Sequence, residues 1–232
     1  MTKLFKSGIL DEFHHLMHGF TTRELNNDYD RIAQEFGILP SQIYALKQIH
    51  SNQIVVLERG MDLVDIPPGD AYVTSRKDVV IGIKTADCVP ILVYEVKQDV
   101  VAAIHAGYKG MLAGVIEKAI HHMTDHLSCQ VEDMRVAIGP CISVDHYEVS
   151  PEIFQDFINV YANNVCCQTY ATARPHLDLR STAKNILEGL GIHPEHIDVS
   201  KRCTYEEQDL FFSHRREPEN KGRQFNFIGM VS

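Results

Sequence analysis

Residues 71–105, AYVTSRKDVVIGIKTADCVPILVYEVKQDVVAAIH, contain four apolar runs that are separated by short polar segments. The runs are rich in Val and Ile, which favour strands, and KQD at residues 97–99 is typical of a tight hairpin turn. Most of the runs are apolar at every position rather than at alternate ones, which indicates a sheet covered on both faces. This stretch therefore predicts the central sheet of the protein.

Further strands and amphipathic helices are predicted on either side of this stretch. Helical apolar spacing occurs at residues 29–36, 111–127, 151–162 and 181–191. Additional strands are expected at residues 44–50, 53–58, 135–140, 197–200, 209–216 and 223–231, whereas residues 3–19 and 163–175 are expected to be irregular or mixed. Because no repeat or linker divides the chain, we expect one α+β domain over residues 1–232, with mixed β-sheets covered by helices.

The composition excludes several classes of protein. The chain has 232 residues, of which 44% are hydrophobic and 23% are charged, so it can bury a substantial core. A net charge of −9 without a dense Lys/Arg run argues against a nucleic-acid surface. The first twenty residues contain no apolar signal-peptide core, and no later apolar run reaches membrane-spanning length. We therefore expect a soluble, cytoplasmic protein with a small-molecule partner and no membrane or nucleic-acid partner.

The cysteines do not form a recognised zinc-ribbon or redox motif. No C-x-x-C pair occurs among them, and two of the six are adjacent. Without an export signal, reduced thiols are expected. The six are Cys88, Cys129, Cys141, Cys166, Cys167 and Cys203.

Three residues with metal-binding side chains lie near the ends of predicted strands: His50, Cys88 and His105. Gly, Pro or polar residues follow each of them, and strand ends are where rigid scaffolds present chemistry. Two neutral imidazoles and a thiolate would hold zinc with three protein ligands and leave a fourth position for water or substrate, as in catalytic zinc sites. We therefore assign all three as metal ligands and catalytic residues, and expect Asp87 or a nearby carbonyl to orient one imidazole.

Two other interpretations of the same residues stay open. Cys88 could be a nucleophile with His105 as its base and a polar group as orienter, the plan of cysteine hydrolases. The three residues could also be ordinary core residues, because thirteen His and six Cys allow many accidental triples. The remaining histidine groups, at residues 14–18 and 121–126, are expected on solvated faces.

An anionic group bound beside the metal would need support from cations. Three basic residues in loop-like contexts are the candidates for a substrate or phosphate contact. Arg23 follows a Thr-Thr pair, Lys109 follows His105 closely, and Arg215 stands at the end of the run FFSHRR.

Several short motifs follow one another in a specific order: QIHSNQIV, GDAYVTS, KTADCVPILVYE, VAAIHAGYKGMLAGVIEKAI, IGPCISVDHYEV and CTYEEQDLFFSHRR. In this order they resemble the YfiH-type laccase-domain family, from about Gly19 to the C-terminus. The resemblance implies a single domain similar in architecture to toxin deamidases, with zinc held by His50, Cys88 and His105.

The resemblance also implies a zinc-dependent purine nucleoside phosphorylase for adenosine, inosine and methylthioadenosine, with adenosine deaminase side activity. Its partners would be a purine nucleoside and phosphate, and the protein would be a monomer or homodimer. One alternative is a copper-dependent polyphenol oxidase, although laccases proper have repeated His-x-His pairs and this chain has none. Another is a Cys88/His105 cysteine hydrolase acting on peptidoglycan precursors.

One motif departs from the family pattern. The usual HAGWRG reads HAGYKG here, so Tyr108 and Lys109 replace Trp and Arg. Lys keeps the charge but loses the bidentate grip of Arg on phosphate or carboxylate, which predicts weaker phosphate binding if this residue contacts it. The purine could meet Tyr108, Phe212 or His214.

Overall fold

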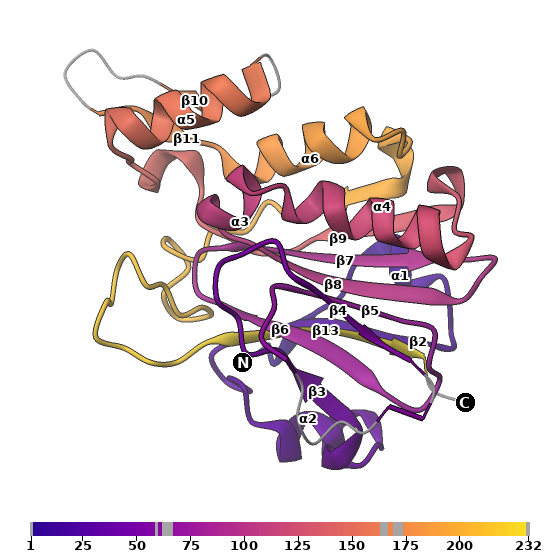
Figure 1. Ribbon diagram of the computed structural model, residues 1–232. Helices are drawn as coiled ribbons and strands as arrows, with labels where there is room; N and C mark the ends of the chain where they lie inside the picture. The colour runs from indigo at the N-terminus through magenta and orange to yellow at the C-terminus, as the bar shows by residue number, and fades with distance from the viewer. Residues whose placement is uncertain (1, 59, 62–66, 163–166, 169–173, 231–232) are drawn as a thin grey trace.

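The computed structural model describes residues 2–58, 60–61, 67–162, 167–168 and 174–230 (Figure 1). Two mixed sheets face each other. The six-stranded sheet has the order β12-β9-β7-β8-β5-β4 and the five-stranded sheet has the order β1-β2-β13-β6-β3, beside a two-stranded β10-β11 pair. The predicted α+β class, with mixed sheets and covering helices, is confirmed.

The strand bounds follow this order along the chain: β1 (Leu4–Phe5), β2 (Leu16–Thr21), β3 (Ile43–Ala45), β4 (Ile54–Leu57), β5 (Ala71–Thr74), β6 (Val80–Thr85), β7 (Val89–Glu95), β8 (Val100–Ala106), β9 (Met134–Ile138), β10 (Cys167–Gln168), β11 (His176–Leu177), β12 (Ile197–Val199) and β13 (Gln224–Met230). The α-helices are α1 (Gly8–Asp11), α2 (Tyr29–Phe36), α3 (Tyr108–Leu112), α4 (Val115–Leu127), α5 (Pro151–Tyr161) and α6 (Leu179–Gly189).

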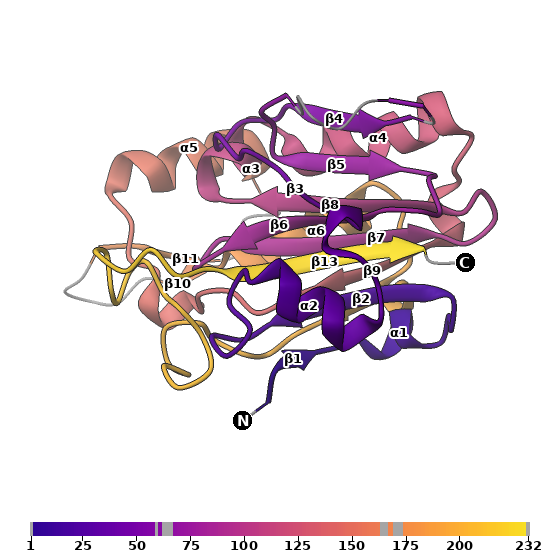
Figure 2. The ribbon, with the colours of Figure 1, turned by 90° about the horizontal axis from the view of Figure 1, so that it is seen from below.

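Strands β7 and β8 lie at the centre of the molecule, and every residue in them is buried. Alternate side chains explain this, because Ile91 and Val93 pack with the helices whereas Leu92 and Tyr94 pack with the second sheet. Helices α4 and α6 cover the outer face of the six-stranded sheet, and α5 packs beside α3 at one end of this helical layer (Figure 1). Helix α2 covers the outer face of the five-stranded sheet (Figure 2). The strands of the central stretch are apolar because they are buried on both faces, but they do not form one sheet as predicted: β5, β7 and β8 belong to the six-stranded sheet and β6 belongs to the five-stranded sheet.

Local signals at α2 explain why that helix was predicted correctly. The Asp28 side chain accepts a hydrogen bond from the backbone N–H of Arg31, which caps the first turn. Gly37 ends the helix with φ 67, in the left-handed region that glycine adopts without strain.

Four predicted elements differ from the structure. The segment 3–19, expected to be irregular, contains β1, α1 and the start of β2. The strand expected at 44–50 ends at Ala45, because the Gln48 side chain rather than the backbone bonds to the next strand. The helix expected at 111–127 is broken by Gly114, with φ 77, into α3 and α4. The strand expected at 209–216 is absent, since these residues form turns.

The loop expected at 163–175 lies mostly outside the described residues, and its described part includes β10. Within the described part of the chain, no helix has both the length and the apolar character needed to cross a bilayer.

His18 in β2 should make the fold sensitive to acid. Its Nε2 accepts a hydrogen bond from the backbone N–H of Ser7, and burial, aided by Lys6, lowers the pKa of His18 from 6.5 to about 4. As the pH falls from 6.5 to 4, His18 becomes protonated in the unfolded chain but stays neutral in the folded chain. The free energy of unfolding should therefore fall by about 3 kcal/mol. Urea unfolding of the wild type and of His18→Gln should show this loss in the wild type alone. Parallel pH profiles would contradict the expectation.

Candidate metal centre

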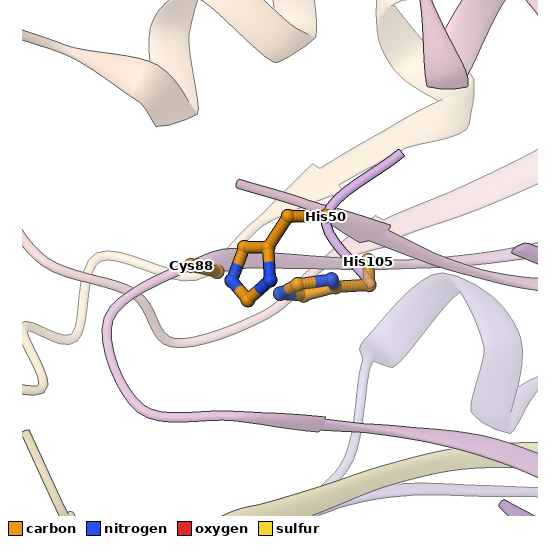
Figure 3. Close-up of side chains that lie close together, drawn as sticks. All are labelled: His50, Cys88 and His105. Atoms are coloured by element: carbon orange, nitrogen blue, oxygen red, sulfur yellow. The ribbon is translucent and has the colours of Figure 1, made fainter. Parts of the chain in front are cut away.

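Three side chains converge at one end of β7 and β8. The ligand atoms of His50, Cys88 and His105 all lie within 4.8 Å of one another, and the three side chains point toward a common region (Figure 3). The two imidazole centroids are 4.9 Å apart. His105 is buried, Cys88 is half-buried and His50 is exposed, so the group opens toward solvent on the His50 side.

Strand pairing brings Cys88 and His105 together. Because β7 runs antiparallel to β8, Val89 lies opposite Ala106 and Pro90 lies opposite His105. Cys88 directly precedes β7, so it begins that strand rather than closing the previous one, which ends at Thr85. Antiparallel pairing of β7 with β8 therefore places the Cys88 thiol beside the end of β8 that carries His105.

His50 lies in a short irregular segment that follows β3 of the five-stranded sheet. The Gln48 side chain donates to the Lys84 carbonyl at 2.8 Å and accepts from the Lys84 N–H at 2.7 Å, which continues the β3–β6 pairing beyond β3. His50 itself has φ 56, an uncommon backbone conformation for a residue with a side chain. The segment is therefore held in one strained geometry that directs the imidazole toward Cys88.

The Asp70 carboxylate contacts both His50 and His105 and holds them in place. This fully buried carboxylate lies 2.8 Å from Nδ1 of His105 and accepts backbone N–H bonds from His50 at 3.0 Å and Ser51 at 2.6 Å. A carboxylate only accepts, so Nδ1 of His105 carries the proton and Nε2 is left for a ligand. The sequence interpretation missed Asp70; its signal is the Gly-Asp pair directly before the apolar run AYVTS.

Asp87 has a different role from the expected one of orienting an imidazole. Its carboxylate accepts from the hydroxyls of Thr204 at 2.7 Å and Ser213 at 3.0 Å, and from the backbone N–H of Arg215 at 2.7 Å. Its φ is 97, which is costly for a residue with a side chain. These bonds hold the segment 204–215 against the site, next to Cys88.

The charges of the site reinforce one another. Burial would raise the pKa of the Cys88 thiol, but His105 and His50 together lower it to about 6. Burial opposes a charge on His105 as well, yet Cys88 and Asp70 raise the pKa of His105 to about 9. At neutral pH the metal-free protein therefore holds a thiolate beside an imidazolium, and a metal would displace the imidazolium proton.

The backbone beside the ligands fits a compact metal site. A Cβ built on Gly107 would lie 2.9 Å from Sγ of Cys88 and 3.4 Å from Cδ2 of His50, so a side chain there would enter the space of the ligands. One thiolate and two imidazole nitrogens are ligands that zinc prefers, and they suit copper as well. Among the described residues, this is the one group of three His, Cys, Asp or Glu side chains placed to hold a metal.

Two cavities adjoin at the ligands: both are lined by His50, Ala86, Cys88 and His214, and the larger is also lined by His105. The larger, of about 480 Å³, is lined by Lys84 and Arg223, both missed in the sequence. The smaller, of about 320 Å³, is lined by residues that include Tyr108, Lys109, Tyr147, Leu179 and Arg215.

Two of the three cations predicted from the sequence line a cavity beside the ligands, and the third does not. Lys109 and Arg215 line the smaller cavity. Arg23 lines neither cavity, because its guanidinium pairs with Glu217 at 3.0 Å and lies over the Phe212 ring, 4.6 Å from the ring centroid. Phe212 is likewise absent from both linings, whereas Tyr108 and His214 are present.

The fold and this ligand set place the chain among α+β proteins with an open site suited to a metal. More particularly, the chain belongs to the multi-copper polyphenol oxidoreductase laccase family, whose sequence model matches residues 17–231. The family is associated with metals, and the arrangement of His50, Cys88 and His105 is in keeping with that.

Relatives of known name and structure support the same family. The chain is 32% identical over 206 residues to an adenosine deaminase from an unknown prokaryotic organism, covering 85% of this chain and 78% of that protein. It is 32% identical over 200 residues to a purine nucleoside phosphorylase of Corynebacterium glutamicum, covering 86% and 78%. The crystal structure of the Bacillus licheniformis hypothetical protein YfiH superposes with a TM-score of 0.89 at 25% identity, covering 95% and 94% of the two chains.

Proposed function

We propose that this protein is a zinc-dependent purine nucleoside phosphorylase that acts on adenosine, inosine and methylthioadenosine, with adenosine deamination as a side activity. The observation that carries the proposal is the convergence of His50, Cys88 and His105 between two cavities lined by cations. Relatives named purine nucleoside phosphorylase and adenosine deaminase support the same reaction classes. We take residues 1–232 as one laccase-like domain, active as a monomer or homodimer.

The protein's own residues would hold the reactants in place. His50, Cys88 and His105 would bind zinc, which when bound supplies Lewis acidity at the position that three ligands leave open. Asp70 would keep Nδ1 of His105 protonated and Nε2 directed at the site. Lys109 and Arg215 would contact the substrate, whereas Arg23 would act indirectly, by holding Phe211 and Glu217 in place.

A reducing compartment suits this site. Cys88 must stay a free thiolate to bind a metal, and cytosolic thiols are kept reduced. This requirement supports the cytoplasmic location expected from the sequence.

A cysteine hydrolase is the second candidate, and one contact favours it. Asp70 lies 2.8 Å from His105, whose positive charge lowers the pKa of Cys88, so the three residues have the order of a Cys-His-Asp nucleophilic triad. In that mechanism Cys88 would attack the substrate directly and no metal would be needed. Copper-dependent phenol oxidation is a third reading, which the family description supports.

Metal analysis combined with chromatography of nucleoside reactions separates the three. Protein purified without added metal should contain zinc at one ion per chain and should release free purine from adenosine, inosine or methylthioadenosine only when phosphate is present. Phenol oxidation at stoichiometric copper without nucleoside turnover would contradict the proposal. Full activity in metal-stripped protein, blocked by thiol alkylation, would favour the Cys88 nucleophile instead.

A further inference from the structure

We propose that inorganic phosphate binds in the larger cavity, between Lys84 and Arg223, while the nucleoside occupies the smaller cavity beside Tyr108 and Tyr147. This assignment rests on the proposed function. It assigns the phosphate contact to Lys84 and Arg223 rather than to Lys109 and Arg215, and it assigns each reactant to its own cavity.

Strand pairing brings the two cations near each other in the fold. Lys84 in β6 lies directly opposite Phe225 in β13, and Arg223 comes two residues before Phe225, just outside β13. Both residues line the larger cavity together with Gln48, His50 and other residues. Two cations that line one cavity favour an anionic ligand, which offsets the repulsion between them.

Among the described residues, no acidic side chain neutralises either cation. Within the described ranges, Arg223 Nη1 donates only to the backbone carbonyls of Asn220 at 3.1 Å and Gly222 at 2.6 Å, and Lys84 Nζ lies 5.7 Å from the Tyr29 ring centroid. No carboxylate forms an ion pair with either residue in the part of the chain that the structure describes. Three other arginines have acidic partners, namely Arg23 with Glu217, Arg76 with Asp78 and Arg202 with Glu207. Arg215 in the smaller cavity resembles Arg223, because its Nη1 donates to the backbone carbonyls of His146 and Glu148.

The linings of the two cavities differ in the way that two reactants would require. No Asp or Glu lines the larger cavity, whose polar groups include Gln48 and Thr85 in addition to the two cations. The smaller cavity is also lined by two cations, Lys109 and Arg215, but it differs in having Asp87, the aromatic rings of Tyr108 and Tyr147 and the apolar side chain of Leu179. A small anion suits the first lining and a purine suits the second.

The shared wall brings the two reactants into contact. Both cavities reach His50, Cys88 and His214, so a phosphate in one and a nucleoside in the other would meet at the metal ligands. An oxygen of dihydrogen phosphate would form the bond to the ribose C1′ as the bond from C1′ to the purine nitrogen breaks. The purine keeps the electron pair and takes the phosphate's proton, so the products are the neutral base and ribose 1-phosphate monoanion.

The test compares variants on the two sides of the ligand group. Arg223→Gln and Lys84→Gln should each raise the KM for phosphate by about 10- to 100-fold, since each removes a charged hydrogen bond, with little change in the KM for inosine. Arg215→Gln, on the other side, should raise the KM for inosine and leave that for phosphate unchanged. Arg31→Gln on the surface of α2 removes the same charge elsewhere and controls for the overall field.

Calorimetric titration of the zinc-loaded protein with inorganic phosphate alone gives a second readout, independent of turnover. Binding that is lost in Arg223→Gln and retained in Arg215→Gln is the expected result, and it would support the phosphate site even if no nucleoside is cleaved. Absence of phosphate binding in the wild type would overturn the proposal. The same holds if Arg215→Gln, rather than Arg223→Gln, raises the KM for phosphate.

Discussion

Cys88→Ala should lose bound zinc and phosphate-dependent purine release together. The thiolate is one of three ligands, and its low pKa, about 6, makes it the ligand that is already deprotonated at neutral pH. Changing a residue that merely orients a ligand costs roughly 10- to 100-fold in metal affinity, so removal of a ligand should cost more. Zinc content per chain after dialysis and the rate of inosine cleavage are the measurements.

The chain offers a matched control for this substitution. Cys167 is exposed and lies in β10, so Cys167→Ala also removes one thiol. That variant should keep zinc, activity and melting temperature. Because the metal-free wild type holds the Cys88 thiolate beside the His105 imidazolium, Cys88→Ala should melt below the metal-free wild type, and its zinc content is measured at a temperature at which the variant is folded. Zinc retained at one ion per chain in Cys88→Ala would show that the thiolate is not a ligand.

Asp70→Asn should weaken zinc binding by roughly 10- to 100-fold, because Asp70 acts through His50 and His105 rather than on the metal. The amide keeps the shape of the carboxylate but turns an NH2 group toward N–H donors from Ser51, His50 or His105. His105 then loses the partner that fixes its tautomer. The measurement is the zinc affinity of folded protein, determined by competition with a chelator. If Asp70 had a purely structural role, this affinity would not change.

Two controls separate positioning from general damage to the fold. Ser51→Ala removes a hydroxyl that donates to Asp70 at 2.9 Å but leaves the contact with His105, so its zinc affinity should stay within a few-fold of the wild type. The second control is pH. Hydrogen bonds from His105 and Ser51 outweigh burial and lower the pKa of Asp70 from 3.8 to about 2. Its contribution to stability is therefore present above pH 3.8 and lost toward pH 2. The stability gap between wild type and Asp70→Asn should shrink over that range, and a constant gap would contradict this assignment.

Much of the fold followed from local sequence patterns. The continuous apolar runs of residues 71–105 correctly predicted strands buried on both faces, since a one-sided sheet would show alternation. The cap at Asp28 and the glycine at Gly37 bounded α2 in the same way. Two strand predictions failed, one for residues 46–50 of the run 44–50 and the other for residues 209–216, and both failures share a physical cause. In the first, the Gln48 side chain bonds to the Lys84 backbone and Asp70 accepts from the backbone N–H of His50; in the second, Asp87 accepts from the backbone N–H of Arg215. Side-chain contacts with residues distant in sequence therefore replace the backbone pairing of a strand.

By itself, the sequence determined most of the strands and helices, because residue type and short-range spacing carry that information. The ordered motifs around His50, Cys88 and His105 singled out the three candidate ligands, which spacing alone would not have done. Only the tertiary structure decided what surrounds those ligands. Asp70 contacts His105, the pairing of β6 with β13 brings Lys84 and Arg223 to the lining of one cavity, and Arg23 forms an ion pair with Glu217. Each of these depends on contacts between segments far apart in the chain, and the register of two strands or the choice of a partner carboxylate leaves no periodic signal in the sequence.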